Sequence, residues 1–198
     1  MPQRYHSLKD HGLLDSLQHG AIGVVPTDTL YGVVCLASDQ EAVKRLYALK
    51  QRERKPGTVV AASVKQLIEL GFKARYLKAV AHYWPGPISV VIPCIDLAYL
   101  HLGVGGVAVR LPRGKEFAKL LSKTGPLLTT SANLPTQPPP ASIAKAEAYF
   151  TQTVDFYVDG GDLSDRQPST IIRIVDDAIE VLRQGAGKID EATGKIIK

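Results

Sequence analysis

The sequence predicts an α/β fold built on a twisted sheet of mixed parallel and antiparallel strands with flanking helices. Short runs of β-branched, apolar residues alternate with segments whose apolar residues recur at helical spacing. A strand, a helix and a second strand follow one another between residues 21 and 63, which is typical of an α/β unit. Three later strands come without intervening helices, so an antiparallel meander is expected beside the crossover units.

Helices are expected wherever apolar residues recur at helical spacing. Leucines predict a first helix over 8–17, before Gly20. Further helices are expected over 39–50, 64–71, 74–84, 115–125 and 141–150. Ser63 is placed to cap the helix over 64–71, and Gly71 is placed to end it.

Strands are expected where β-branched and apolar residues run together. These segments are 21–25, 58–63, 88–94, 107–112, 127–132, 154–160, 169–175 and 178–185. A chain of 198 residues is long enough for one domain with a full core. We therefore expect a single domain over 1–198, with its core at about 8–186.

Composition and cysteine usage favour a cytoplasmic protein without membrane contact. Hydrophobic residues make up 45% and charged residues 22%, and no apolar run approaches a membrane span. The N-terminus lacks the apolar region of a signal peptide. Cys35 and Cys94 lie far apart outside any CxxC motif and are expected to be reduced, buried thiols. The five histidines form no HxxxH pair, so no metal site on the protein is expected.

Positive charge is concentrated in the middle of the chain. The net charge is +5, but residues 44–123 hold fifteen Lys and Arg against four acids, whereas residues 155–191 hold nine acids. This asymmetry predicts a surface for an anionic partner, either nucleotide phosphate or nucleic acid. For any single lysine, a solvated helix face is the competing interpretation.

The stretch "VPTDTLYG" (25–32) places several polar side chains directly after a predicted strand. Thr27, Asp28, Thr29 and Tyr31 offer donors and acceptors, and Gly32 permits close backbone approach. Ligands of α/β sheets bind beyond the carboxyl ends of strands. A binding edge and a turn stabilised by its own side chains both remain open at this point.

A second group of candidates is cationic. In "LKQRERKPG" (49–57), Lys50, Arg52, Arg54 and Lys55 crowd a predicted helix end. The helix dipole accounts for part of this, but four neighbouring cations repel one another and favour a polyanionic ligand.

Further hydroxyls, an amide and an arginine end the predicted strands "TTSAN" (129–133), "QPST" (167–170) and "LRQG" (182–185). Neither Ser131 nor Thr29 has an identifiable histidine partner, so the pattern favours positioning and charge stabilisation over covalent catalysis.

Taken in order, seven segments resemble the YrdC-like family of threonylcarbamoyl-AMP synthases, in its short, single-domain form. They are "VVPTDTLYG", "LYALKQR" with a following "KP", "WPGPISVVI", "VAVRLP", "LLTTSAN", "PSTIIRI" and "VLRQG". The resemblance implies a nucleotidyltransferase on a twisted sheet that encloses an electropositive cavity. It implies formation of L-threonylcarbamoyl-AMP and pyrophosphate from ATP, L-threonine and bicarbonate, with Mg²⁺ accompanying the nucleotide. The product would serve tRNA threonylcarbamoyladenosine synthesis, with tRNA threonylcarbamoyl-transfer proteins as partners.

The resemblance also implies a role for each matching residue. Lys50 and Arg52 would be catalytic. The ATP-binding residues would be Arg52, Lys55, Ser131, Asn133 and Arg183. The threonine-binding residues would be Thr29, Arg110, Thr129 and Ser169.

The chain departs from the family pattern at three places. "RERKP" is one residue shorter than usual, which shifts Lys55. Val60 replaces a frequent histidine, and Pro139 stands where a nucleotide-contacting serine is common, with Ser142 nearby. Two alternatives stay open: a non-enzymatic module that binds tRNA or double-stranded RNA through the basic surface, and, because of the altered loop after Arg52, a paralogue acting on a different carbamoyl substrate.

Overall fold

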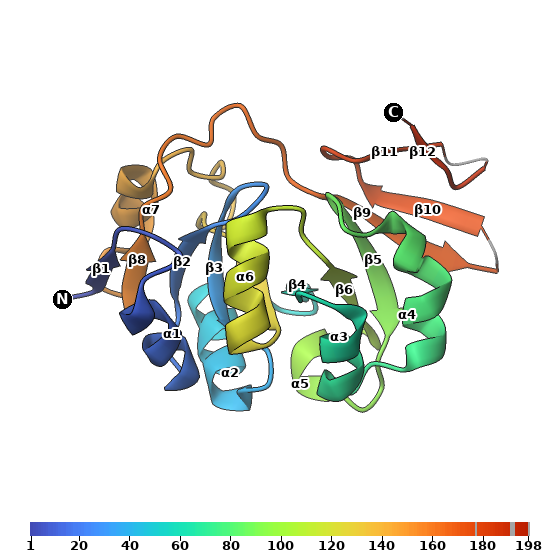
Figure 1. Ribbon diagram of the computed structural model, residues 1–198, viewed down its shortest axis with the longest axis horizontal. Helices are drawn as coiled ribbons and strands as arrows, with labels where there is room; N and C mark the ends of the chain where they lie inside the picture. The colour runs from blue at the N-terminus through green and yellow to red at the C-terminus, as the bar shows by residue number, and fades with distance from the viewer. Residues whose placement is uncertain (177, 191–192, 198) are drawn as a thin grey trace.

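A computed structural model of the chain describes residues 1–176, 178–190 and 193–197. Ten strands form one mixed sheet in the order β1-β8-β2-β3-β7-β4-β6-β5-β9-β10 (Figure 1). In chain order they are β1 (Gln3–Tyr5), β2 (Gly23–Pro26), β3 (Tyr31–Leu36), β4 (Thr58–Val60), β5 (Ile88–Pro93), β6 (Gly106–Arg110), β7 (Leu127–Ser131), β8 (Phe156–Val158), β9 (Thr170–Val175) and β10 (Ala178–Arg183). A separate antiparallel pair consists of β11 (Lys188–Ile189) and β12 (Ile196–Ile197).

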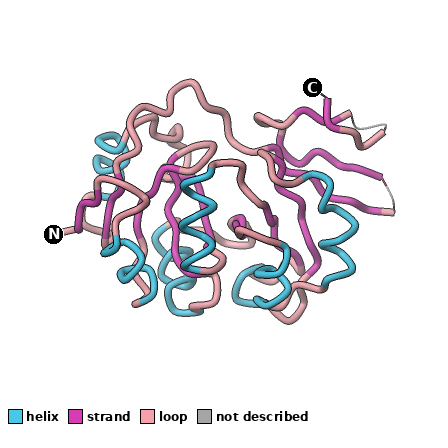
Figure 2. The backbone as a smooth tube through the Cα atoms, viewed as in Figure 1, coloured by secondary structure: helices cyan, strands magenta, loops and turns pink. Residues whose placement is uncertain are grey.

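Seven α-helices and one 3₁₀ turn connect the described strands (Figure 2). They are α1 (His11–Gln18), α2 (Gln40–Leu49), α3 (Val64–Leu70), α4 (Ala74–Val80), η1 (Ala81–Tyr83), α5 (Ala98–His101), α6 (Lys115–Thr124) and α7 (Ile143–Phe150). The predicted helix signals of α3 are confirmed, because Ser63 Oγ accepts from the Gln66 N–H and Gly71 adopts a φ of 119°. No helix in the described part of the chain is long and apolar enough to cross a membrane.

The sheet separates two apolar cores. Adjacent valines of one strand belong to different cores, as Val33 and Val34 do on β3, because successive side chains of a strand point to opposite faces. The larger core includes side chains of α2, α4 and α7. The smaller core, on the other face, is covered by α1 and α6. Cys35 and Cys94 are both free and buried in the larger core, as predicted.

The face covered by α1 and α6 is open over β4, β6, β5 and β9. By alternation from Val60, this face carries Thr58 on β4 and Ala108 and Arg110 on β6, which pair with the β4 residues. Ser89 and Ile171, paired between β5 and β9, continue the row. All of these side chains except Ile171 are small, polar or cationic, and all except Ser89 line a pocket. The uncovered part of the sheet is therefore where a ligand can reach the strands.

The predicted antiparallel meander is only partly present. β9 and β10 form an antiparallel hairpin, but β8 lies at the opposite end of the sheet, parallel to β1 and β2. The connection over 159–169 crosses one edge of the molecule to join them (Figure 1). All three residues of β8 are buried, as expected for a strand between two others, here β1 and β2. A strand in a hairpin at the sheet edge would be more exposed.

The stretch "VPTDTLYG" contains a turn, one of the two structures considered for it, but the second strand that makes it a hairpin was not predicted. Pro26 pairs with Tyr31, and β3 runs antiparallel to β2. The apolar run that follows Gly32 was the available signal for β3, and it was not assigned. β1, α5, β11 and β12 were also not predicted; each is four residues or shorter.

Candidate active site

A polar pocket of about 100 Å³ opens on the uncovered sheet face. Residues 56–58, Ile171 and Arg183 also line a larger, more apolar neighbouring pocket of about 510 Å³. The smaller pocket is formed by the β2–β3 turn, the loop before β4 and the ends of β6, β7 and β10. Its lining residues are Thr27, Thr29, Leu30, Tyr31, Gly32, Arg52, Pro56, Gly57, Thr58, Arg110, Thr129, Thr130, Ser131, Pro168, Ser169, Ile171 and Arg183.

Seven of the ten predicted site residues line this pocket. They are Thr29, Arg52, Arg110, Thr129, Ser131, Ser169 and Arg183. Lys50, Lys55 and Asn133 do not line it. Lys55 is exposed, and Lys50 and Asn133 lie behind the wall that Ser131 contributes.

The turn over 27–30 is braced by its own hydroxyls. Thr27 Oγ1 donates to the Leu30 carbonyl at 2.7 Å and accepts from the Thr29 N–H at 3.0 Å. The two threonine hydroxyls are 3.0 Å apart, so the Thr29 hydroxyl donates to Thr27 Oγ1. Thr29 Oγ1 is then left as an acceptor at the pocket wall. Thr27 therefore holds the turn, and Thr29 lies at the pocket wall, where its role in binding threonine stays a prediction.

Arg110 is held by a buried ion pair. Both carboxylate oxygens of Asp28 lie 2.7 Å from Arg110 Nη1, and the two side chains are 9% and 3% exposed. Arg110 Nε is buried and has no hydrogen-bond partner among the described residues. An arginine offers five N–H groups, so this one keeps unused donors where it meets the pocket.

Arg52 is half-buried on a tightly turned loop. Its Nη1 donates to the carbonyls of Lys55 at 3.0 Å and Pro56 at 3.2 Å. The loop is anchored from α2, because the Tyr47 hydroxyl accepts from the Gly57 N–H at 3.1 Å. Burial lowers the pKa of Arg52 from its ordinary value. The guanidinium nevertheless stays charged, since an arginine pKa lies far above neutrality.

Arg183 completes the group of cations. Its Nε and Nη2 donate to the Ser169 carbonyl at 3.1 and 2.7 Å, and Nη2 reaches Ser169 Oγ at 3.1 Å. Burial lowers the pKa of Arg183, and the charges of Arg52 and Arg110 lower it further. None of the described residues that line the pocket is acidic. Arg52 and Arg183, which have no carboxylate among their described hydrogen bonds, therefore repel each other in a partly desolvated space, and an anion would relieve this repulsion.

Lys50 and Asn133 shape the loop that follows β7. Lys50 is 5% exposed, and its Nζ donates to the carbonyls of Ser131, at 2.9 Å, and of Asn133. The Asn133 amide donates to the carbonyls of Leu134 and Gln137, at 3.0 and 2.7 Å. In this structure both side chains support the pocket wall, and the catalytic role of Lys50 and the ATP contact of Asn133 stay predictions.

The protonation of Lys50 makes a testable contribution to stability. Burial, followed by the charge of Arg52, lowers the pKa of Lys50 to about 8. An unfolded lysine titrates at about 10.4, so between these values the unfolded chain holds more protons and stability rises with pH. The Lys50→Met variant should lack this rise, which amounts to at most about 1.4 kcal/mol per pH unit. Urea unfolding of both proteins at pH 7, 8, 9 and 10 tests this, and parallel pH profiles would contradict it.

The shortened segment "RERKP" contributes Arg52 and Pro56 to the pocket, whereas the other two family departures lie outside it. Val60 is a buried core residue, Pro139 is exposed, and Ser142 is the N-cap residue of α7. None of these three lines the pocket.

Sequence reasoning missed Asp28 as the partner of Arg110, and Tyr47 as the anchor of Gly57. Asp28 and Arg110 are 82 residues apart in the sequence, and no local pattern links them.

Fold and pocket together define a class of protein: an α/β protein whose mixed sheet bears a pocket of arginines and hydroxyls on the part that its helices leave open. Residues 15–185 match the Sua5–YciO–YrdC family model, which is described as telomere recombination. The chain belongs to this family.

Curated relatives and solved structures agree with this assignment. The threonylcarbamoyl-AMP synthase of Pseudomonas syringae pv. syringae is 32% identical over 176 residues, covering 85% of this chain and 93% of that protein. The one from Pseudoalteromonas translucida is 33% identical over 163 residues, covering 78% and 87%.

Pyrococcus abyssi Sua5, solved in complex with L-threonine, matches with a TM-score of 0.83 at 25% identity, covering 97% of this chain. This chain spans 59% of that Sua5 chain. Escherichia coli YciO matches with a TM-score of 0.80 at 21% identity, covering 95% and 98%, which shows the common fold. The predicted fold class, a mixed sheet with flanking helices, is confirmed.

Proposed function

We propose that this protein is a threonylcarbamoyl-AMP synthase, a nucleotidyltransferase that uses ATP, L-threonine and bicarbonate and releases pyrophosphate. The observation that carries the proposal is the pocket itself, which joins three arginines with the hydroxyls of Thr29, Thr129, Ser131 and Ser169 and has no acidic residue in its described lining. ATP, bicarbonate, the threonine carboxylate and pyrophosphate are all anions, so one cationic site suits every reactant. The names of the curated relatives support the same activity.

Threonine is proposed to bind at the Arg110 end of the pocket. The unpartnered Arg110 Nε can donate to the carboxylate, which arginine recognises through parallel N–H bonds. Thr29 Oγ1, left as an acceptor, suits a donor such as the threonine hydroxyl. The Pyrococcus Sua5 structure was solved with L-threonine, which supports a threonine site in the family.

The nucleotide phosphates are proposed to bind between Arg52 and Arg183. In the reaction, the threonine amine combines with bicarbonate to give a carbamate and water. A carbamate oxygen then attacks the α-phosphorus, and the bond from that phosphorus to the leaving pyrophosphate breaks. Charge grows on the phosphoryl oxygens and on pyrophosphate, and fixed guanidinium groups stabilise it. Mg²⁺ enters as part of the substrate, bound to the phosphate oxygens.

The proposal extends to the fate of the product. Threonylcarbamoyl-AMP is an activated mixed anhydride, so a transfer reaction must consume it, and tRNA with its threonylcarbamoyl-transfer proteins is the acceptor system we propose. We also propose that the chain acts in the cytoplasm. We further propose that it forms one domain, because β1 to β10 form one sheet.

Pyrophosphate release tests the function. We expect release from MgATP only when threonine and bicarbonate are both present, with reactions lacking either one as controls. Bound ATP without release, in fresh bicarbonate and Mg²⁺, would overturn the proposal.

The same preparations separate the two alternatives. Steeply salt-dependent tRNA or double-stranded RNA binding without turnover would favour the RNA-binding module. Turnover that requires bicarbonate and an amine other than threonine would favour the paralogue.

A further inference from the structure

Among the described residues, Asp28 supplies the only carboxylate that forms an ion pair with an arginine of the pocket. It stands in the β2–β3 turn with both oxygens on Arg110 Nη1, and its Oδ2 also accepts from the Arg113 N–H at 3.1 Å. Gly114 lets the backbone after β6 close over it, since a Cβ there would lie 3.1 Å from the Asp28 Cβ. Asp28 is thus held by the end of β6 and the residues that follow it, 110–114, and it fixes Arg110 in turn.

This contact divides the donors of Arg110. The two N–H groups of Nη1 face Asp28, while Nε remains buried and unpartnered in a guanidinium that lines the pocket. A planar carboxylate accepts two parallel bonds from adjacent guanidinium nitrogens, provided that the guanidinium cannot rotate. Asp28 prevents that rotation, because it holds Nη1 with both oxygens.

Asp28 also makes the net charge differ between the two ends of the pocket. Arg110 is neutralised by its own carboxylate, whereas the structure places no carboxylate on Arg52 or Arg183 among their described hydrogen bonds. The unneutralised cations are therefore at the Arg52 and Arg183 end. A polyphosphate gains most from net positive charge, while a single carboxylate gains from matched geometry.

We infer that Asp28 is a positioning residue that sorts the two anionic substrates: it aims Arg110 at the threonine carboxylate and keeps phosphate groups from that end of the pocket. This inference rests on the proposed function. Asp28 then contributes to substrate selection in addition to its structural role in the β2–β3 turn.

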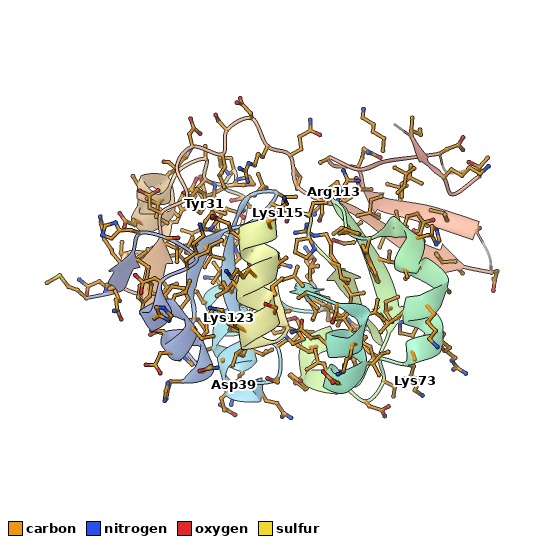
Figure 3. The ribbon with its side chains drawn as sticks, in the orientation of Figure 1. Tyr31, Asp39, Lys73, Arg113, Lys115 and Lys123 are labelled. Atoms are coloured by element: carbon orange, nitrogen blue, oxygen red, sulfur yellow. The ribbon has the colours of Figure 1, made fainter. Side chains whose placement is uncertain are left out.

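The Asp28→Asn variant tests the inference through separate Michaelis constants. We expect the KM for threonine to rise by about 10- to 100-fold, because Arg110 is no longer aimed, while the KM for ATP changes less than twofold. Pyrophosphate should become a competitive inhibitor against threonine in the variant and not in the wild type. Asp39→Asn is the matched control, because Asp39 also accepts backbone N–H bonds but caps α2 at the opposite edge of the molecule from Tyr31 and Arg113 (Figure 3).

A second pair of variants guards against a folding defect. Arg110→Lys keeps the charge but lacks the fork, so adding Asp28→Asn to it should leave the threonine KM unchanged. Equal rises in both Michaelis constants in Asp28→Asn, or an additive effect in the double variant, would overturn the inference. If the wild type releases pyrophosphate and Asp28→Asn has the same Michaelis constants, the inference is overturned and the proposed function stands. A wild type that neither binds threonine in calorimetry nor releases pyrophosphate would overturn the proposed function as well.

Discussion

Replacing Arg52 by Ala is expected to lower kcat for pyrophosphate release by at least about 10²-fold, the effect of removing one fixed donor that stabilises transition-state charge. Arg52 is half-buried in the pocket, and its charge has no carboxylate partner among the described residues. The Arg52→Ala variant therefore loses electrostatic stabilisation of the leaving pyrophosphate. Steady-state kinetics at saturating MgATP and threonine would measure it.

Arg54→Ala is the matched control for Arg52→Ala. Arg54 lies on the same loop with the same charge, but it is exposed and does not line the pocket. Its loss should change kcat less than twofold. If the two variants lose activity equally, the effect belongs to the loop as a whole and the assigned role of Arg52 is wrong. Binding of RNA, if present, should weaken only modestly in either variant, since each removes a single cation.

Gly185→Ala is expected to destabilise the protein by about 1–3 kcal/mol, as overpacking does, and to reduce kcat/KM. A Cβ at Gly185 would lie 2.2 Å from the Pro168 carbonyl oxygen and 2.8 Å from that of Ser169. Backbone cannot yield as a flexible side chain does, so the segment that carries Ser169 must move. Arg183 donates to the same Ser169 carbonyl, and both residues line the pocket. Urea unfolding and kinetics measure the two effects.

Gly103→Ala is the control for that substitution. No atom lies within 4 Å of a Cβ built there, and only its φ of 81° opposes a side chain. The cost should be about 1–2 kcal/mol of left-handed strain, with kcat/KM unchanged. An equal loss of kcat/KM in Gly103→Ala and Gly185→Ala would contradict the assignment of Ser169 and Arg183 to the site.

Local signals predicted local structure well. Ser63 and Gly71 bound α3 as expected, because a cap depends on residues a few positions apart. The placement of β8 was wrong, because the sheet edge that a strand joins depends on tertiary packing. The strand at Tyr31 was overlooked for another reason: the hydroxyls before it suggested an end, and they belong to a turn.

The charge count predicted an anionic ligand but could not locate a site for it. Arg52 and Arg110 come from the basic middle of the chain, whereas Arg183 comes from the segment rich in acids. Other central lysines are exposed at helices instead: Lys115 and Lys123 lie on α6, and Lys73 directly precedes α4 (Figure 3). The resemblance located seven lining residues, but their contacts, such as that of Arg110 with Asp28, depend on strand register that no linear motif encodes.

The β9–β10 hairpin has a consequence for synthesis on the ribosome. It pairs with β5 at the edge of the sheet, and Ser169 and Arg183 stand at its two ends. A nascent chain can pair β1 to β8 before residues 169–183 leave the exit tunnel, but the larger core then lacks Ile172 and the pocket lacks one of its three arginines. Because the β9–β10 hairpin completes the pocket, binding competence is expected to arise only after this hairpin has paired with β5, when most of the sheet has already formed.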